Sequence, residues 1–266
     1  MKSFIHLSDL HIHKNNERKD NQNCIAIVNE IINIYQEKKP VILITGDIVD
    51  DGHEAQYRNA VKILKPLVEN DFIVLAVPGN HDYGPLGNFY TEKSQMHFQK
   101  YILADLLGYK KVLQEGVTME LIYPIISEFD EMLFIGVDSV VGAENELLHF
   151  ASGEVGKPQR EKIQQILHEY KNSNKKKVVY FHHHPFDRRY VMEMDDAKEL
   201  MRLLAGKVDF VCFGHDHKSE IFYSKNQIEC MMASGKTPKK NKSNKFQFRE
   251  VKIYPNGNKI AMVSFK

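Results

Sequence analysis

Short apolar runs rich in β-branched residues recur along the chain and predict buried strands. Each run ends at a polar or glycine-containing turn, which is typical of strands inside a sheet that is covered on both faces. The six runs are residues 4–7 (FIHL), 41–45 (VILIT), 72–77 (FIVLAV), 133–137 (LFIGV), 178–181 (VVYF) and 208–213 (VDFVCF).

Helical periodicity fills several of the intervals between these runs. Apolar residues recur at three- and four-residue spacing in residues 25–35, 57–68 and 163–170. Asp195 precedes the sequence AKELMRLLAG and predicts the N-cap of a further helix, with Gly206 just past its end. The order strand, helix, strand predicts a partly parallel sheet with helices on its outer faces.

The C-terminal part changes character. Residues 220–266 contain four strand-like runs without helices between them, and YPNGNK supplies a hairpin turn. We therefore expect 220–266 to form C-terminal strands of a second, more antiparallel sheet. The whole pattern predicts an α/β fold, a four-layer αββα sandwich of two packed mixed β-sheets flanked by helices, in a single domain over residues 1–266.

Two segments fit this pattern least. Residues 84–116 are polar and mixed, with one amphipathic piece near their middle, and we expect them to form a cap or insertion. The run KTPKKNKSNK at 236–245 is typical of a solvated loop, with contact to an anionic substrate or lipid surface as the alternative.

Composition places the chain among ordinary globular proteins. It has 266 residues, 42% hydrophobic and 27% charged, enough for an independent core. The formal net charge of +1 lacks the electrostatic footprint of a non-specific nucleic-acid binder, so a nucleic-acid partner is not expected. Three widely spaced cysteines, Cys24, Cys212 and Cys230, predict buried, reduced thiols.

The N-terminal sequence MKSFIHLSDLHIH lacks the continuous apolar region and cleavage site of a secretory signal. No segment reaches the ~20 apolar residues of a membrane-spanning helix. We expect a cytoplasmic protein without a transmembrane segment, and the sequence does not indicate its oligomeric state.

Side chains capable of binding a metal follow the predicted strands. The carboxyl ends of strands are where open α/β sheets place ligands. Asp9 and His11 are two residues apart and share one side of an extended chain, as do His215 and His217. Asp47 directly follows a buried strand and is well placed to bridge two ions. The remaining candidates are Asn80, His81 and Asp82 in PGNHD and the three histidines of HHHP, His182, His183 and His184.

Any one of these residues alone is typical of a turn or a cap. Five separate strand ends that each carry an oxygen or imidazole donor, in a fixed order, together indicate a metal centre. Nitrogen and oxygen ligands without thiolate favour Mn, Fe, Zn or Co over Ca or Mg alone.

The five blocks DLH, GD, GNHD, HHP and GHDH resemble the ordered motifs of the calcineurin-like metallophosphoesterase superfamily. The resemblance covers residues 9–217. In its length and its intact GNHD block, the chain resembles the bacterial class III cyclic-nucleotide phosphodiesterase branch of this superfamily. The resemblance implies two divalent or trivalent metal ions, Mn or Fe first and Zn or Co as alternatives.

The resemblance also implies how the residues share the two ions. One ion would be held by Asp9, His11, Asp47 and His217, and the other by Asp47, Asn80, His183 and His215, with Asp47 as the bridge. The choice of His183 over His182 follows the family's spacing to the proline and stays open because three histidines are consecutive.

The expected function is hydrolysis of a phosphoester, most simply a small-molecule phosphodiester such as a cyclic nucleotide, by a metal-activated hydroxide. His81 would be the catalytic donor to the leaving oxygen, and Asp82 would orient His81 or cap a helix. The alternatives are a nuclease, a lipid-headgroup or nucleotide pyrophosphatase, and a non-catalytic interaction module on this fold.

Weaker signals lie near these motifs. His13 and His53 are candidates for substrate contact, although loop histidines are common. Arg188 and Arg189 are candidates for a bidentate phosphate clamp, and a surface ion pair with Asp187 is the favoured alternative.

Overall fold

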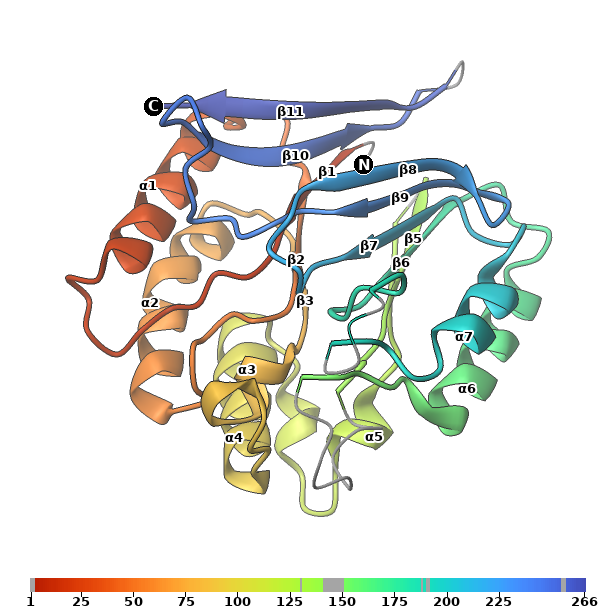
Figure 1. Cartoon of the computed structure of the whole chain (residues 1–266), viewed down its shortest axis with the longest axis horizontal. Helices are drawn as coiled ribbons and strands as arrows, with labels where there is room; N and C mark the ends of the chain where they lie inside the picture. The colour runs from red at the N-terminus through yellow and green to blue at the C-terminus, as the bar shows by residue number, and fades with distance from the viewer. Residues whose placement is uncertain (1–2, 130, 141–150, 188, 190–191, 255–256) are drawn as a thin grey trace.

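The computed structural model describes residues 3–129, 131–140, 151–187, 189, 192–254 and 257–266. Two β-sheets stack face to face, and helices cover both outer faces (Figure 1). The predicted four-layer αββα sandwich is therefore confirmed.

The first sheet has five strands in the order β11-β10-β1-β2-β3. The central strand β1 pairs in parallel with β2 on one side and antiparallel with β10 on the other. Its strands are β1 (Ser3–Leu7), β2 (Val41–Thr45), β3 (Val74–Val77), β10 (Phe246–Lys252) and β11 (Lys259–Phe265).

The second sheet has six strands in the order β4-β5-β6-β7-β9-β8. The four strands β5, β6, β7 and β9 are parallel, and β4 and β8 close the two edges in antiparallel pairs. Its strands are β4 (Ile125–Glu128), β5 (Met132–Gly136), β6 (Lys176–Tyr180), β7 (Phe210–Phe213), β8 (Glu220–Lys225) and β9 (Ile228–Ala233).

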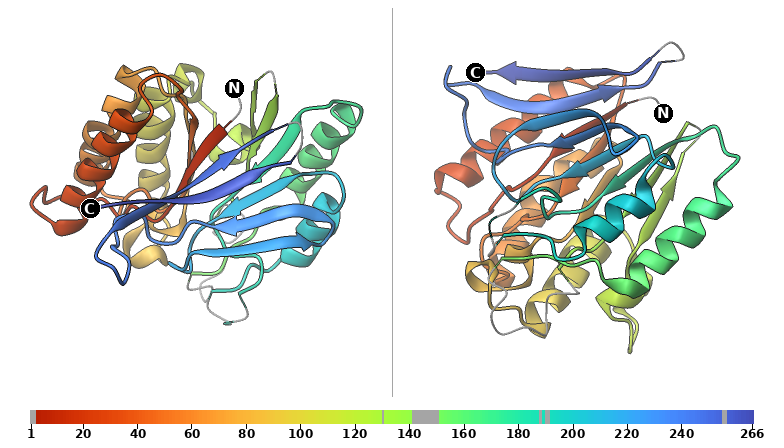
Figure 2. Two further views of the ribbon diagram at one scale, coloured as in Figure 1. Left: turned by 90° about the horizontal axis from the view of Figure 1, so that it is seen from above. Right: turned by 45° about the vertical axis from the view of Figure 1, so that its right-hand side comes forward.

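The long helices lie on opposite sides of the sandwich. Helices α1 (Lys19–Ile34) and α2 (Glu54–Glu69) flank the first sheet, whereas α6 (Gly156–Glu169) and α7 (Ala197–Leu204) flank the second (Figure 2). Shorter elements lie between β3 and β4: α3 (Asn80–Tyr83), η1 (Pro85–Gly87), α4 (Glu92–His97), η2 (Phe98–Leu106), η3 (Lys110–Leu113) and α5 (Met119–Ile122).

Alternation along the strands divides the core into two layers. Phe4 of β1 makes edge-to-face contacts with Phe134 and Phe210 of the second sheet, with ring centroids 5.7 and 6.0 Å apart. The next residues along those strands, such as Leu133 and Val211, pack on the other side with α6 and α7. Because successive side chains point to opposite faces, each strand of the second sheet serves both layers.

The C-terminal strands correct one prediction. Residues 220–266 do not all join the second sheet: β8 and β9 do, but β10 and β11 extend the first sheet, with Ser3 opposite Lys252. Strand β1 would otherwise leave one row of backbone hydrogen-bonding groups unpaired, and β10 satisfies it. An alternating pattern predicts a strand but does not indicate which edge it pairs with.

The segment 84–116 divides into two parts. Its second half packs beside α2, where Tyr57 stacks on Tyr101 at 6.3 Å and meets Phe98 edge to face. Ile102 and Leu103 have no exposed surface, so this half belongs to the helical layer. The first half, around Gly87, lies at the candidate site described below.

Smaller predictions have mixed outcomes. Helix α7 begins one residue later than predicted, with Asp196 as N-cap, and the Asp196 carboxylate accepts backbone N–H groups at the start of α6. The three cysteines are free and buried, as expected. Within the described residues, no helix is both long and apolar enough to cross a membrane.

The packing of Phe4 between the sheets gives a stability prediction. Phe4→Ala should lower the free energy of unfolding by about 3–5 kcal/mol, because it removes the aromatic contacts and leaves a cavity. Met262→Ala on β11, where the side chain is 40% exposed, is the control and should cost less than about 1 kcal/mol. Urea denaturation followed by circular dichroism measures both, and equal losses would contradict the described core.

Candidate metal centre

Sharp turns after the strands aim the candidate ligands at one point. Five of them adopt left-handed backbone conformations, which non-glycine residues rarely do and which cost about 1–3 kcal/mol each. Their φ angles are 54° at Asp9, 46° at His11, 50° at Asp47, 72° at His215 and 55° at His217. Strain of this kind concentrates at functional sites, where the surrounding structure maintains it.

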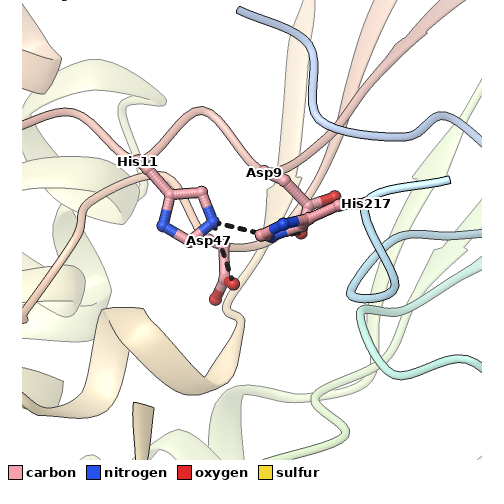
Figure 3. A group of neighbouring side chains, drawn as sticks. All are labelled: Asp9, His11, Asp47 and His217. Atoms are coloured by element: carbon pink, nitrogen blue, oxygen red, sulfur yellow. Dashed lines mark hydrogen bonds and ion pairs between the residues drawn. The ribbon is translucent and has the colours of Figure 1, made fainter. Parts of the chain in front are cut away.

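One group of ligands comprises Asp9, His11, Asp47 and His217, as predicted. Each offers a ligand atom within 4.8 Å of the others, and the four side chains converge in Figure 3. His11 Nε2 lies 3.0 Å from His217 Nε2 and 3.6 Å from Asp47 Oδ2, while His217 Nε2 lies 3.5 Å from Asp9 Oδ1. Two imidazoles and two carboxylates around one point form a suitable site for a divalent cation.

A second group lies on the other side of Asp47. His182 Nε2 is 3.4 Å from Asp47 Oδ2, 3.0 Å from Asn80 Oδ1 and 3.2 Å from His215 Nδ1. The same carboxylate oxygen, Asp47 Oδ2, therefore lies within 3.6 Å of an imidazole of each group. This is the position that a bridging carboxylate requires.

The geometry favours His182, rather than the predicted His183, in the second group. The Nδ1 atom of His182 is 2.8 Å from the carbonyl oxygen of Thr45, which leaves its Nε2 facing Asp47. Metal-binding histidines commonly use one nitrogen for such an orienting bond and the other for the ion. His183 instead places Nδ1 2.8 Å from Ser139 Oγ, and its ring packs against Gly153.

Strand alternation explains this difference. Val178 and Tyr180 of β6 face the core between the sheets, whereas Val179 and Phe181 face the outer layer. By the same alternation, His182 faces the core between the sheets, as Val178 and Tyr180 do. The spacing to the proline, on which the choice of His183 was based, does not take this alternation into account. His184 lies away from the metal centre, and its Nε2 pairs with Glu220 Oε2 at 3.1 Å.

The donor set fits two cations by a further criterion. Within the described part of the chain, Asp9 Oδ2, His183 Nε2 and His215 Nε2 are buried and have no hydrogen-bond partner, although buried polar atoms are rarely left unsatisfied. This criterion supports a metal centre and does not by itself separate His183 from His182. Asn80 donates its amide to the carbonyl oxygen of Gly87 at 3.1 Å, which turns its oxygen toward His182. The residues present thus offer oxygen and nitrogen donors, without thiolate, to two adjacent ions.

The pKa values of Asp47 and His182 indicate that the second group favours a positive charge beside the Asp47 carboxylate. Burial opposes ionisation of Asp47, but His182, His81 and His11 together hold its pKa well below the usual value. Burial also lowers the pKa of His182, yet Asp47 and Asp9 outweigh it and raise this pKa to about 9. A bound cation would take the place of that proton.

His81 lies beside the centre without entering either group. Its backbone N–H donates to Asp47 Oδ1 at 3.0 Å, and its ring lies 4.8 Å from that of His11. The Nδ1–H donates to the carbonyl oxygen of Asp50 at 2.7 Å. An ideal Cβ added to Gly87 would lie 3.0 Å from His81 Nε2, so this turn lies over the ring.

Sequence reasoning missed Asp50. Its Oδ1 lies 3.3 Å from His11 Nδ1. The Asp50 carboxylate therefore orients the predicted ligand His11 through the ring nitrogen opposite the one that faces Asp47. The signal was present, because Asp50 follows Asp47 by three residues in the same loop, GDIVDDG.

Asp82 has a structural position. Its carboxylate accepts the N–H groups of Ile48, Val49 and Gly79 at 3.2, 3.0 and 2.9 Å. Burial, followed by repulsion from Asp47, raises its pKa to about 7 despite these bonds. By accepting the N–H of Gly79, the carboxylate caps α3, which is one of the two expected roles. It also connects the loop after β2 to the turn before α3. These contacts do not support a catalytic role.

The weaker candidates are engaged elsewhere. His53 is the N-cap of α2, and His13 Nδ1 accepts the N–H of Asn15, so substrate contact by either remains a prediction. Arg189 pairs with Asp187 and Asp216, the alternative favoured over a phosphate clamp. Arg188 lies outside the described residues.

The assignment of His182 gives a direct prediction. After loading with Mn²⁺ and gel filtration, His182→Ala should retain about one ion per chain fewer than the unaltered protein, because its second group loses an imidazole. His183→Ala is the matched control and should retain the same metal content. Elemental analysis of folded samples measures both, and the reverse result would assign the ligand role to His183.

Comparison with known proteins agrees with this geometry. Residues 2–219 match the sequence profile of a family described as calcineurin-like phosphoesterase. A probable cyclic nucleotide phosphodiesterase of Coxiella burnetii is 27% identical over 222 residues, covering 79% of this chain and 74% of the relative.

Solved structures share the fold at low identity. A dimetal phosphatase from Danio rerio superposes with a TM-score of 0.69 at 14% identity, covering 100% of this chain and 99% of that one. A purple acid phosphatase from yellow lupin, Lupinus luteus, has a TM-score of 0.62 at 13% identity, covering 99% and 51%. From the match of its sequence over residues 2–219, this chain belongs to the calcineurin-like phosphoesterase family and is a phosphoesterase.

Proposed function

We propose that this chain is a binuclear metal-dependent hydrolase of small-molecule phosphodiesters, such as a cyclic nucleotide. The observation that carries the proposal is Asp47 Oδ2, which lies within 3.6 Å of His11 on one side and of His182 on the other. The substrate class is supported by the name of the Coxiella burnetii relative, a probable cyclic nucleotide phosphodiesterase.

Mn or Fe would occupy the two positions, with Zn or Co as alternatives, since the donors are imidazole, carboxylate and amide. When bound, two such ions supply an activated water and neutralise the charge of the phosphoryl group. The ligands themselves favour an anionic substrate: Asp9 and Asp47 carry the two carboxylates, and Asn80 is neutral, so two divalent ions retain an excess of positive charge. The substrate would be a small molecule met in the cytoplasm, and the buried free cysteines support that compartment.

His81 would give a proton to the leaving oxygen. The carbonyl oxygen of Asp50 accepts from Nδ1 and fixes the ring, so that Nε2 is the nitrogen available to the substrate. The backbone N–H of His81 also donates to Asp47 Oδ1, which keeps the ring at a constant position relative to the bridging carboxylate.

Substitution of His81 tests this role. His81→Ala should leave both ions bound and lower kcat by about 10²–10⁴-fold on alkyl phosphodiesters, whose leaving groups need a proton. The loss should be much smaller on bis-nitrophenyl phosphate, because nitrophenolate leaves without protonation. An equal loss on both substrates would contradict proton donation by His81.

Metal removal tests the function as a whole. Protein treated with a chelator should lose hydrolysis of cyclic nucleotides and bis-nitrophenyl phosphate, and added Mn²⁺ should restore it. A panel that also contains nitrophenyl phosphate, nucleotide pyrophosphates and single-stranded DNA separates the proposed diesterase from the alternatives. Activity confined to the DNA or to the pyrophosphates would overturn the assigned substrate class.

A further inference from the structure

We propose that Lys236 binds a second anionic group of the substrate, so that the site prefers phosphodiesters that carry an additional phosphate. This inference rests on the proposed function. Lys236 begins the lysine-rich run predicted to be a solvated loop. The start of that run is instead attached to residues that lie next to the ligands Asp9 and His217 in the sequence, as the following contacts indicate.

Residues 234–237, here named the strap, follow β9 and attach to β1 and the turn after it. The hydroxyl of Ser234 donates to the carbonyl oxygen of His6 at 3.1 Å. The N–H of Thr237 donates to the carbonyl oxygen of Ser8 at 3.0 Å, and the N–H of Ser8 donates to Thr237 Oγ1 at 2.9 Å. Thr237 is therefore fixed to the residue immediately before the ligand Asp9.

The other end of the strap contacts the second ligand loop. Gly235 has a φ of +77°, and an ideal Cβ there would lie 3.0 Å from the backbone N of Ser219 and 3.1 Å from the carbonyl carbon of Lys218. Only glycine combines this conformation with such a close approach. Lys236 thus stands between the loop that carries Asp9 and the loop that carries His217.

The side chain of Lys236 is anchored to helix α1. Its ammonium pairs with Asp20 of α1 at 2.9 Å, and 22% of its side chain is exposed. The ammonium is therefore held by α1, on a strap that is attached to the residue before Asp9 and to the loop that follows His217.

This placement suits an anionic group beside the scissile phosphate. An ammonium has three donors, and Asp20 occupies only part of them, so a phosphate oxygen can share the cation. Asp20 itself is partly exposed, and its pairing with Lys236 holds the long side chain in one direction before substrate arrives. A charge-assisted hydrogen bond to phosphate is strong enough to alter affinity by about tenfold or more.

The test compares two synthetic diesters that differ by one phosphate. Thymidine 5′-(nitrophenyl phosphate) and its 3′-phosphorylated form carry the same leaving group. The Mn-loaded protein should hydrolyse the 3′-phosphorylated form with about tenfold higher kcat/KM. Lys236→Gln should abolish this preference through KM, with kcat nearly unchanged, and Lys236→Arg should preserve it.

Two further variants separate substrate binding from a structural role. Lys242→Gln, an equal change of charge at an exposed position of the same loop, should leave the preference intact. Asp20→Asn should keep most of it, because the ammonium remains available and only its orienting partner is weakened. Loss of the preference in Asp20→Asn to the extent seen in Lys236→Gln would assign Lys236 to the ion pair alone and overturn the inference.

The outcomes distinguish this inference from the proposed function. If the Mn-loaded protein hydrolyses neither diester, the proposed function fails. If it hydrolyses both without preference, or if the preference survives Lys236→Gln, the function stands and the role of Lys236 is wrong. Unchanged metal content and circular dichroism in Lys236→Gln would exclude misfolding as the cause of any loss.

Discussion

Everything at the centre depends on the contact between Asp47 and imidazoles from both halves of the sandwich. His11 follows a strand of the first sheet and His182 follows a strand of the second, yet both reach the same carboxylate oxygen within 3.6 Å. Their separation is therefore fixed by how the sheets face each other. The aromatic packing of Phe4 against Phe134 and Phe210 contributes to that relation, and in this way the stability of the fold is linked to the geometry of the site.

Close backbone approach makes this meeting sterically feasible. An ideal Cβ on Gly79 would lie 2.3 Å from Asp47 Oδ1, and one on Gly214 would lie 1.9 Å from Ser8 Oγ. The ligand loops can therefore approach one another only with glycine at these two positions. Asp82 completes the arrangement, since its buried carboxylate joins the loop after β2 to the turn before α3 through three backbone N–H groups.

The sequence predicts the layers and most ligands because both follow from local patterns. Apolar runs define the strands, and Asp9, His11, Asp47 and His217 follow strand ends at spacings that direct them to one side. What it did not predict depends on three-dimensional pairing. Strands β10 and β11 joined the first sheet because the edge of β1 was available, and no residue pattern encodes that choice.

Two assignments within the site depend on more than local spacing. The family's spacing to the proline favours His183, whereas the inward alternation of Val178 and Tyr180 favours His182. Asp82 was expected to orient His81 or to cap a helix, and the helical turn directs its carboxylate to backbone N–H groups, in agreement with the second alternative. Neighbours in sequence within a short helix do not share a face, so adjacency to a catalytic residue is weak evidence of a catalytic role.

The bridging position of Asp47 is tested most directly by anomalous diffraction from crystals of the Mn²⁺-loaded protein. The account predicts two anomalous peaks about 3.5–4 Å apart, the usual spacing of paired catalytic metals, on either side of the Asp47 carboxylate. One peak should lie among Asp9, His11 and His217, and the other among Asn80, His182 and His215. A single peak, or two peaks that do not share Asp47, would contradict the account.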